Sequence, residues 1–356
     1  MSGTTTATKT YLNFIDGQWI AATSGKTCEN RNPADTRDLV GIFQRSGAHE
    51  VNLAVEAAQR AFRAWSLTPA PRRAEILLKA ADILEQKKEG FARDMTREMG
   101  KVLKETRGDT QEAIDCGHFF AGEGRRMYGL TTPSELPNKF AMATRQPIGV
   151  VGMICPWNFP MAIPSWKLFP ALVAGNTCVI KPATDTPLST YNLVQTLMDA
   201  GLPAGVVNIV AGSGNAVGEP LVGHPDVRAI SFTGSSAVGS QVAQRAAAGF
   251  KQVSLEMGGK NAQIVMDDAN LDLALDGALW GAFGTTGQRC TATSRILLQK
   301  GIAAEFTEKF VARAKALKVG DGLDESVEVG PQVNPSQIET SAKYVSIILS
   351  YGNYSR

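Results

Sequence analysis

The chain has 356 residues, of which 44% are hydrophobic and 20% are charged, and its formal net charge is +2. This balance is typical of a soluble globular protein of roughly two domains. It shows no basic stripe with interleaved aromatic residues, so we expect no nucleic-acid partner. No apolar run approaches the roughly 18 residues of a membrane span, and the polar residues 1–10 do not resemble a secretory signal, so we expect no membrane association and a cytoplasmic location.

The first predicted element is a helical layer over residues 49–128. Val51, Val55, Ala58 and Phe62 recur there at three- and four-residue steps, which is the spacing of an amphipathic helix. The pattern stops near Gly129.

Short apolar runs then alternate with segments of helix length. We predict strands at 148–154, 177–181, 206–210, 227–232 and 252–255, with a helix at 162–174 between the first two. This alternation predicts an α/β fold with a doubly wound, Rossmann-like parallel sheet, which binds ligands at the carboxyl ends of its strands.

A second α/β pattern follows Gly258. Strands are expected at 261–265 and 294–298, and helices at 271–283 and 303–317. We therefore place a domain boundary near Gly258.

Two glycine-containing loops each follow a predicted strand and open a helix. Residues 212–218 miss the spacing of a dinucleotide fingerprint by one residue, whereas Gly234 and Ser235 begin a second turn of this kind. Free backbone N–H groups at a helix start suit a phosphate, but a simple helix cap after a tight turn, by Ser235 or Ser236 in the second loop, explains either loop equally well.

Three further segments carry reactive side chains. Glu256 ends a strand before two glycines, where it is either a general base or the partner of Lys260 in a salt bridge. Asn158 stands between prolines, in a rigid turn that either directs its amide at an oxyanion or only caps the turn. Cys290 lies on a polar loop after Arg289, whose charge favours a thiolate, although a lone loop cysteine is usually inert.

Cysteine and histidine counts argue against a metal site. The chain has three histidines, and its five cysteines form no Cys-x-x-Cys pair, so no zinc site is expected. Those cysteines are Cys28, Cys116, Cys155, Cys178 and Cys290.

Taken in order, these segments resemble the aldehyde dehydrogenase superfamily. The matching strings are Pro-Trp-Asn-Phe-Pro at 156–160, Ile-Lys-Pro-Ala at 180–183, Phe-Thr-Gly-Ser at 232–235, Glu-Met-Gly-Gly-Lys at 256–260 and Gly-Gln-Arg-Cys at 287–290. The likeness runs from about residue 14 to about residue 333, and it is strongest to the 2-oxoglutarate semialdehyde and succinic semialdehyde dehydrogenases.

The resemblance implies a catalytic role for three of these residues. Cys290 would add to the aldehyde as a thiolate, the oxyanion would be held by the amide of Asn158 and the N–H of Cys290, and Glu256 would activate the water that releases the acid. It also implies NADP or NAD as cofactor and no metal. The residues that it assigns to cofactor binding are Pro156, Trp157, Lys181, Pro182, Thr184, Gly234, Ser235 and Met257.

Two departures from the family bear on specificity. Thr184 stands where many NAD-preferring members carry a glutamate, so we predict that NADP+ is accepted. Succinic semialdehyde dehydrogenases usually present Thr-Arg-Lys where this chain has Ser-Trp-Lys at 165–167, whereas residues 287–295 are more similar to 2-oxoglutarate semialdehyde dehydrogenases. The predicted substrate is an acidic semialdehyde such as 2-oxoglutarate semialdehyde.

The resemblance also gives a domain plan. Residues 1–128 form an N-terminal arm and helical layer, 129–147 form bridging strands for oligomerisation, 148–257 form the Rossmann-like cofactor core, and 258–356 form a catalytic domain. The catalytic domain is expected to be truncated, because family members continue for over a hundred residues with a late strand that joins subunits in a homo-oligomer. The sequence at 347–356 is atypical of the family at that point. The alternative hypothesis is a catalytically impaired fragment that still binds the dinucleotide.

Overall fold

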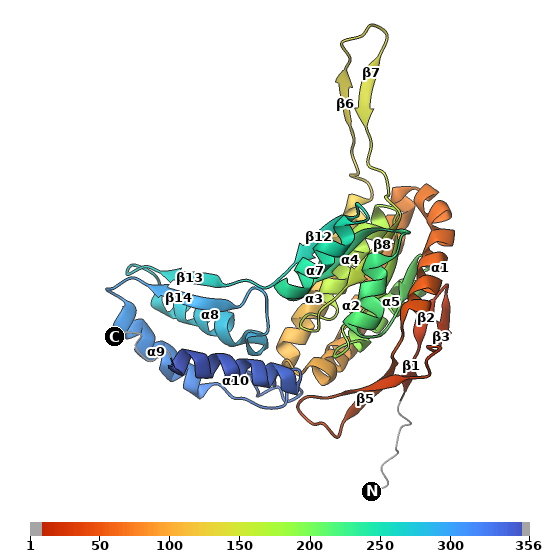
Figure 1. Cartoon of the computed structure of the whole chain (residues 1–356). Helices are drawn as coiled ribbons and strands as arrows, with labels where there is room; N and C mark the ends of the chain where they lie inside the picture. The colour runs from red at the N-terminus through yellow and green to blue at the C-terminus, as the bar shows by residue number, and fades with distance from the viewer. Residues whose placement is uncertain (1–8, 351–356) are drawn as a thin grey trace. The chain divides into compact units, whose positions relative to one another are not determined.

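The computed structural model describes residues 9–350 and divides them into two compact units (Figure 1). The first unit comprises the residues up to Glu29, Gly41–Ala92 and Arg107–Met257. The second comprises Asn30–Val40, Arg93–Thr106 and the residues from Gly258 onward. Of the atypical stretch 347–356, residues 351–356 lie outside the described part of the chain, as do residues 1–8 of the polar N-terminus.

The first unit is built on a seven-stranded sheet in the order β12-β11-β8-β9-β10-β2-β3. Its five parallel strands are β8 (Val150–Ile154), β9 (Thr177–Lys181), β10 (Val207–Ile209), β11 (Val227–Thr233) and β12 (Gln252–Glu256). An antiparallel hairpin of β2 (Asn13–Ile15) and β3 (Gln18–Ile20) extends the sheet beside β10. Every residue of β8 and β9 is buried, as in strands that helices cover on both faces. The predicted doubly wound parallel sheet is confirmed.

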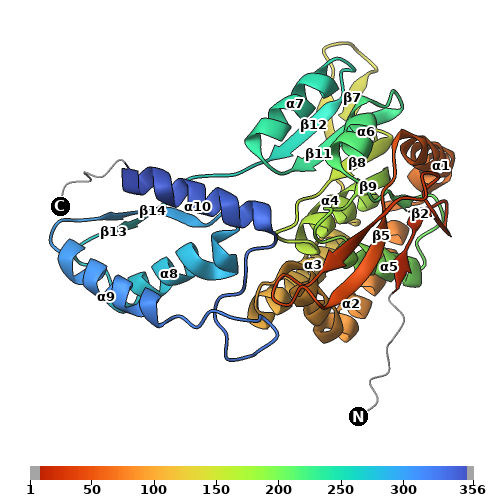
Figure 2. The same cartoon turned by 60° about the horizontal axis from the view of Figure 1, so that its bottom comes forward.

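Helices connect the parallel strands and cover both faces of this sheet (Figure 2). Right-handed crossovers place α4 (Ala162–Val173) and α5 (Leu188–Asp199) on one face. The chain then reverses direction across the sheet, so that α6 (Glu219–Gly223) and α7 (Ser236–Ala247) pack with α1 (Ala48–Leu67) on the other. The apolar residues of α1 that we predicted to face a core, among them Val51, Val55 and Ala58, are fully buried in this layer.

Two long helices and two small sheets complete this part of the chain. α2 (Ala70–Met99) and α3 (Leu103–Glu123) pack beside α4, where Gly117 lies against Ala81 and Phe169. A three-stranded sheet has the order β1 (Thr10–Tyr11), β5 (Leu39–Gln44), β4 (Thr27–Arg31). The hairpin of β6 (Leu130–Pro133) and β7 (Phe140–Ala143) is exposed at every position. In residues 9–350 no helix combines the length and apolar character that crossing a membrane requires.

The second unit contains a small βαβ motif. β13 (Asn261–Val265) and β14 (Thr293–Leu298) are parallel, with α8 (Leu271–Phe283) between them, and α9 (Ala303–Ala316) and α10 (Pro335–Ser350) follow. Val265, Leu275, Ala278, Ile302 and Phe306 form its core.

Two earlier stretches of the chain belong to this second unit, 30–40 and 93–106. The carboxylate of Asp38 pairs with Arg97 at 2.6 Å, and the guanidinium holds the pKa of that carboxyl below its usual range. Gly100 has a φ of +93° and packs between Pro33 and Pro331, where a side chain would not fit.

Candidate active site

A cavity of about 560 Å³ opens in the first unit at the carboxyl ends of two sheet strands. Ile154 ends β8, and Phe232 lies at the end of the neighbouring β11. Because the strand order reverses between β8 and β11, the cavity sits at the topological switch point, where doubly wound sheets bind their ligands. Its volume is in the range of small-molecule sites. The lining is partly apolar, from Val222, Val238 and Val242, and partly polar, from Asn215, Glu219, Gln241, Gln244 and Arg245.

Both loops singled out in the sequence contribute to this cavity or begin a helix beside it. Ser213 accepts the Ala216 N–H at 3.2 Å and caps a short π-helix (Gly214–Gly218), and Ser235 accepts the Val238 N–H at 3.4 Å and caps α7. The helix-cap interpretation of the second loop is therefore correct. Capping satisfies one N–H, whereas a helix start carries about four N–H groups that its own turns do not use, so this cap is compatible with anion binding.

Lys181 lies at the end of β9 and is 5% exposed. Its Nζ donates to the carbonyls of Pro182 at 2.7 Å and Gly212 at 3.4 Å, and the hydroxyl of Thr184 donates to the same Gly212 carbonyl at 3.4 Å. Burial lowers the pKa of Lys181 to about 8, because two neutral carbonyls compensate the ammonium only in part. An anionic or hydroxylated ligand at this point would complete its hydrogen bonds.

Asn158 lies on the loop that follows β8. The loop is held in place by two threonine hydroxyls, since Thr186 donates to the carbonyl of Trp157 at 3.1 Å and Thr190 to that of Pro160 at 3.3 Å. Asn158 itself is half-buried. The rigid turn predicted from the prolines is thus fastened by α5 and the segment before it as well.

Glu256 is the last residue of β12, and its side chain is exposed. Its carbonyl accepts the Gly234 N–H at 3.0 Å, which links the end of β12 to the loop before α7. Its negative charge also interacts electrostatically with Lys167 of α4. Lys167 is 8% exposed, and its ammonium donates to the hydroxyl of Ser231 at 3.0 Å. Burial lowers the pKa of Lys167, and the charges of Cys155 and Glu256 oppose that shift.

Lys167 is a candidate site residue that the sequence analysis missed. The signal was present, because this lysine interrupts an otherwise apolar helix, and a buried cation needs compensation. The preceding Trp166, which the sequence analysis contrasted with the arginine of succinic semialdehyde dehydrogenases, is 45% exposed.

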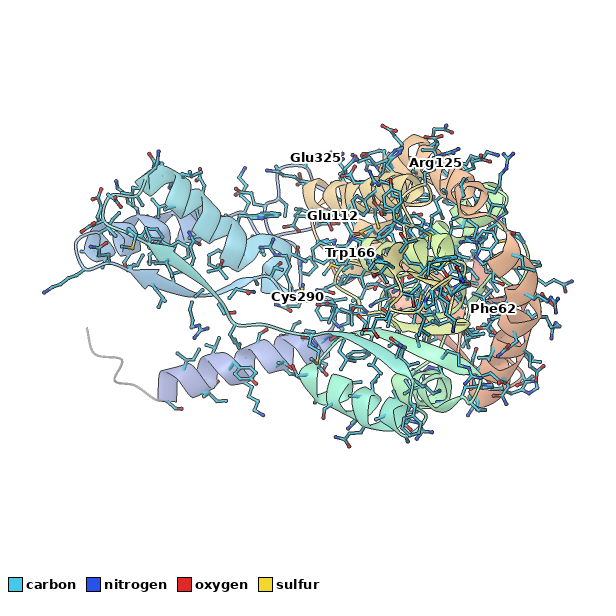
Figure 3. The ribbon with its side chains drawn as sticks, turned by 90° about the horizontal axis from the view of Figure 1, so that it is seen from above. Phe62, Glu112, Arg125, Trp166, Cys290 and Glu325 are labelled. Atoms are coloured by element: carbon cyan, nitrogen blue, oxygen red, sulfur yellow. The ribbon has the colours of Figure 1, made fainter. Side chains whose placement is uncertain are left out.

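Cys290 lies in the second unit and is exposed, on the loop that joins α8 to β14 (Figure 3). Asn261 of β13 donates its side-chain amide to the Cys290 carbonyl at 2.9 Å. Earlier in the loop, Thr285 and Thr286 have φ values of +53° and +57°, a left-handed conformation that is uncommon for β-branched residues. The cysteine loop is therefore an ordered, strained turn rather than a loose connection.

Arg289 does not extend freely over the cysteine. Its guanidinium stacks on the Trp280 ring at 4.7 Å and donates to the carbonyls of Trp280 and Gly281. Burial lowers the pKa of Arg289, while the charges of Glu105 and Cys290 oppose the shift. The prediction that this arginine favours a Cys290 thiolate stays a prediction.

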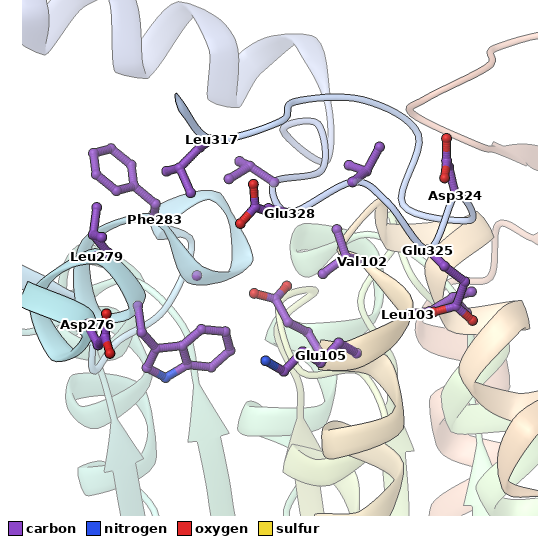
Figure 4. A pocket seen from close by; sticks show the side chains of 15 residues that line it. Val102, Leu103, Glu105, Asp276, Leu279, Phe283, Leu317, Asp324, Glu325 and Glu328 are labelled. Carbon is purple, nitrogen blue, oxygen red and sulfur yellow. The ribbon is translucent and has the colours of Figure 1, made fainter. Parts of the chain in front are cut away.

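A second cavity, of about 420 Å³, lies within the second unit (Figure 4). Its lining combines apolar residues of α8, such as Leu279 and Phe283, with Glu105 at the start of α3. Glu105 is 8% exposed and accepts the backbone N–H of Thr285 at 2.6 Å. Nothing in the sequence distinguishes Glu105 from the other charged residues of the helical layer.

The predicted site residues thus fall into two sets, and each set is ordered within its own unit. Asn158, Glu256 and all eight predicted cofactor residues belong to the first unit, and Cys290 belongs to the second. Within the first unit, Lys181, Thr184 and the two glycine-containing loops adjoin the ends of the central strands.

Comparison with known proteins identifies relatives of this chain. The chain matches the aldehyde dehydrogenase family over residues 19–353. It is 47% identical to the alpha-ketoglutaric semialdehyde dehydrogenase of Bacillus subtilis, with 96% of this chain and 70% of that protein covered. It is 41% identical to the 2,5-dioxopentanoate dehydrogenase of Saccharolobus solfataricus, over 95% of this chain and 70% of that protein. A crystal structure of an Escherichia coli NADP-dependent enzyme superposes with a TM-score of 0.94 at 40% identity and covers 97% of this chain and 71% of that one.

These matches extend over both units of the chain. The chain belongs to the aldehyde dehydrogenase family, whose members are NAD(P)-dependent enzymes that oxidise aldehydes to carboxylic acids.

Proposed function

We propose that the chain oxidises 2-oxoglutarate semialdehyde (2,5-dioxopentanoate), or a closely similar acidic semialdehyde, to the dicarboxylate with NADP+ or NAD+. The observation that carries the catalytic part is the exposed thiol of Cys290 on a loop whose backbone is fixed by Asn261 and Glu105. A nucleophile needs this combination of access and fixed geometry to attack a bound carbonyl.

The proposed steps use three side chains. The Cys290 thiolate forms a C–S bond to the carbonyl carbon of the aldehyde, and the amide of Asn158 with the N–H of Cys290 stabilises the resulting oxyanion. The aldehyde C–H bond breaks with loss of a hydride, and a thioester is left on Cys290. Glu256 removes a proton from water, which attacks the thioester and releases the carboxylate and the thiol.

The residues of the first unit fit a dinucleotide. The partly apolar cavity would take the adenosine half, the N–H groups at the start of α7 beside Gly234 and Ser235 would take the pyrophosphate, and Lys181 would bind the adenosine ribose. Pro156, Trp157, Pro182 and Met257 would line the same groove. When bound, the nicotinamide accepts the hydride. Because Thr184 carries no negative charge, a 2′-phosphate is tolerated beside Lys181, and we propose that both cofactors are used.

The names of the relatives support the proposed substrate. Two of the three relatives described above are dehydrogenases of the 2-oxoglutarate semialdehyde class, and this chain shares 41–47% of its residues with them. Trp166, at the position of the arginine that succinic semialdehyde dehydrogenases usually carry, offers no cation to a substrate carboxylate. This departure from the succinic semialdehyde dehydrogenase pattern counts against succinic semialdehyde, and the choice of 2-oxoglutarate semialdehyde rests on the names of the relatives.

A substrate panel tests the proposal. The purified chain is assayed with 2-oxoglutarate semialdehyde, succinic semialdehyde and a neutral aldehyde of equal length, each with NADP+ and NAD+, beside the Cys290→Ala variant. We expect the highest kcat/KM for 2-oxoglutarate semialdehyde and no turnover by the variant. Equal kcat/KM values for the neutral aldehyde would reject the acidic substrate, and a kcat/KM for NADP+ more than about a hundredfold below that for NAD+ would reject dual cofactor use.

A second candidate function is dinucleotide binding without turnover. The observation that favours it is that the cavity at the switch point is formed by the first unit alone, while Cys290 belongs to the second unit. Quenching of protein fluorescence by NADP+ together with no aldehyde-dependent reduction of the cofactor would select this function.

A further inference from the structure

Glu105 is a buried carboxylate bonded to the loop that carries Cys290. It lies at the start of α3, and its Oε1 accepts the backbone N–H of Thr285 at 2.6 Å, across 180 residues of sequence. Both residues belong to the second unit. Figure 4 shows the Glu105 carboxylate projecting from the start of its helix into the cavity beside α8.

The Thr285 N–H requires such an acceptor. α8 ends at Phe283, and the N–H of Gly284 still bonds back into the helix, to the Trp280 carbonyl. Thr285 comes next, is 2% exposed and has turned into the left-handed region, so no water and no helical carbonyl is available to its N–H. A buried N–H without a partner is rarely tolerated, and the Glu105 carboxylate supplies the partner.

The turn at Thr285 is strained as well as buried. Thr285 and Thr286 both have positive φ values, which β-branched residues adopt only when surrounding contacts hold them. The Thr286 hydroxyl is fixed to the Gly330 carbonyl at 2.8 Å. The Glu105 carboxylate is therefore one of a small number of groups that hold two adjacent residues in an unfavourable conformation.

The conformation of this turn is transmitted along the loop to the cysteine. The backbone N–H of Gln288 donates to the Thr285 carbonyl at 2.9 Å, and the Gln288 side chain bonds the same carbonyl at 3.2 Å. Two residues later Asn261 holds the Cys290 carbonyl at 2.9 Å. The loop is thus fixed at Thr285, Gln288 and Cys290, and the first of these points depends on Glu105.

The charged neighbours of Glu105 make a carboxylate sustainable at this buried position. Lys101, which is fully buried in the connection between α2 and α3, and Arg289 on the cysteine loop both favour its ionised form. Burial acts in the opposite direction and raises the pKa of Glu105. A buried charge pair of this kind is weak evidence for a role in stability.

We propose that Glu105 is a positioning residue for catalysis, because its hydrogen bond to Thr285 holds the left-handed turn that sets where the Cys290 thiol is presented. The proposal rests on the proposed function, in which Cys290 is the nucleophile. It assigns the effect to the acceptor atom at this position and not to the negative charge.

Two conservative variants separate the acceptor from the charge. Glu105→Gln keeps the length and an acceptor oxygen but loses the charge, whereas Glu105→Asp keeps the charge but is one methylene too short to reach Thr285. Glu328→Ala is the matched control, since Glu328 lines the same cavity but its carboxylate bonds the Lys318 N–H. All three are compared with the unmodified full chain for kcat, aldehyde KM, NADP+ affinity and the rate of Cys290 alkylation by iodoacetamide.

We expect Glu105→Asp to lower kcat and the alkylation rate about 10- to 100-fold, which is the range for a misplaced reacting group, while the aldehyde KM and NADP+ affinity stay within about twofold. Glu105→Gln and Glu328→Ala should stay within about threefold of the unmodified chain in every measurement. Loss of kcat in Glu105→Gln equal to that in Glu105→Asp would overturn the proposal, because the charge would then be the active feature. Unchanged kcat in Glu105→Asp would overturn it as well.

The Cys290→Ala variant separates failure of this inference from failure of the proposed function. If Cys290→Ala still oxidises the aldehyde, the proposed function is wrong and the role of Glu105 falls with it. If Cys290→Ala is inactive and Glu105→Asp is fully active, the proposed function stands and only the positioning role is rejected.

Discussion

Replacing Thr184 by glutamate should convert the chain to strong NAD+ preference. Lys181 Nζ and the Thr184 hydroxyl each lie 3.4 Å from the Gly212 carbonyl, so the two side-chain ends are at most about 7 Å apart. A 2′-phosphate that binds beside Lys181 would therefore lie close to a carboxylate introduced at position 184. Thr184 is exposed, so the longer side chain meets no packed core.

The magnitude follows from Coulomb's law at this separation. Two unit negative charges about 6 Å apart repel by ~0.7 kcal/mol in bulk water and by ~3 kcal/mol at the effective dielectric of a protein surface. These energies correspond to about 3- to 100-fold in kcat/KM. The second charge of the phosphate raises the lower end to about 10-fold, and salt screening at this exposed position keeps the upper end near about 100-fold. NAD+, whose ribose offers hydroxyl groups to the new carboxylate, should be unaffected or slightly favoured.

The assay is kcat/KM for NADP+ and for NAD+ with one aldehyde, in the unmodified chain, Thr184→Glu and Thr184→Gln. The glutamine variant matches the glutamate in size but carries no charge, so it isolates the electrostatic effect. The effect should also weaken as salt is raised, because the site is exposed. If Thr184→Glu and Thr184→Gln give the same ratio of NADP+ to NAD+ efficiency, the 2′-phosphate does not lie beside Lys181 and the reasoning fails.

Three further predictions follow from burial. Because the pKa of Lys181 is lowered to about 8, its ammonium is present below that pH and is lost above it. The ratio of kcat/KM for NADP+ to kcat/KM for NAD+ should therefore fall as the pH rises from about 7 to about 9.5. A ratio that does not change with pH would contradict this. Burial raises the pKa of the Cys155 thiol to about 11 and that of Cys178 further, whereas Cys290 is exposed. In peptide mapping, iodoacetamide should therefore label Cys290 before either buried thiol, and the reverse order would count against the structure. Arg73 is 5% exposed and donates hydrogen bonds to the carbonyls of Val173, Trp65, Ser66 and Thr68. Arg73→Met should therefore lower the free energy of unfolding, measured by urea titration, by about 2–4 kcal/mol. A loss below about 0.5 kcal/mol would show that these hydrogen bonds contribute little.

Several elements were predictable because their signal is local. Strand β9 and helix α8 have the bounds that the sequence indicates, Thr177–Lys181 and Leu271–Phe283. A continuous apolar run predicts a buried parallel strand, and Asn270 caps α8 by accepting the Leu273 N–H, as the preference for asparagine at helix starts predicts. The same holds for Ser235 at α7.

The candidate site was predictable only in its residue types. Lys181, Glu256, Asn158 and Cys290 were found through spaced strings that match a family, and not through any property of a single segment. The sequence alone left Glu256, Asn158 and Cys290 open between a structural and a functional role, and it assigned Lys181 only through the resemblance. Their assignment to catalysis and cofactor binding remains a proposal that the variants above test.

By itself, the sequence determined the alternation of strands and helices, the doubly wound class of fold and the family, because periodicity and motif spacing are properties of consecutive residues. Only the tertiary structure decided which strands are neighbours, and therefore that a cavity forms where the order reverses between β8 and β11. It also decided that 30–40 and 93–106 join the second unit, and that Glu105 bonds a left-handed Thr285. Threonine has no preference for that conformation, and a hydrogen bond across 180 residues leaves no local pattern, so both arise only when the folded chain brings distant backbone and side chain together.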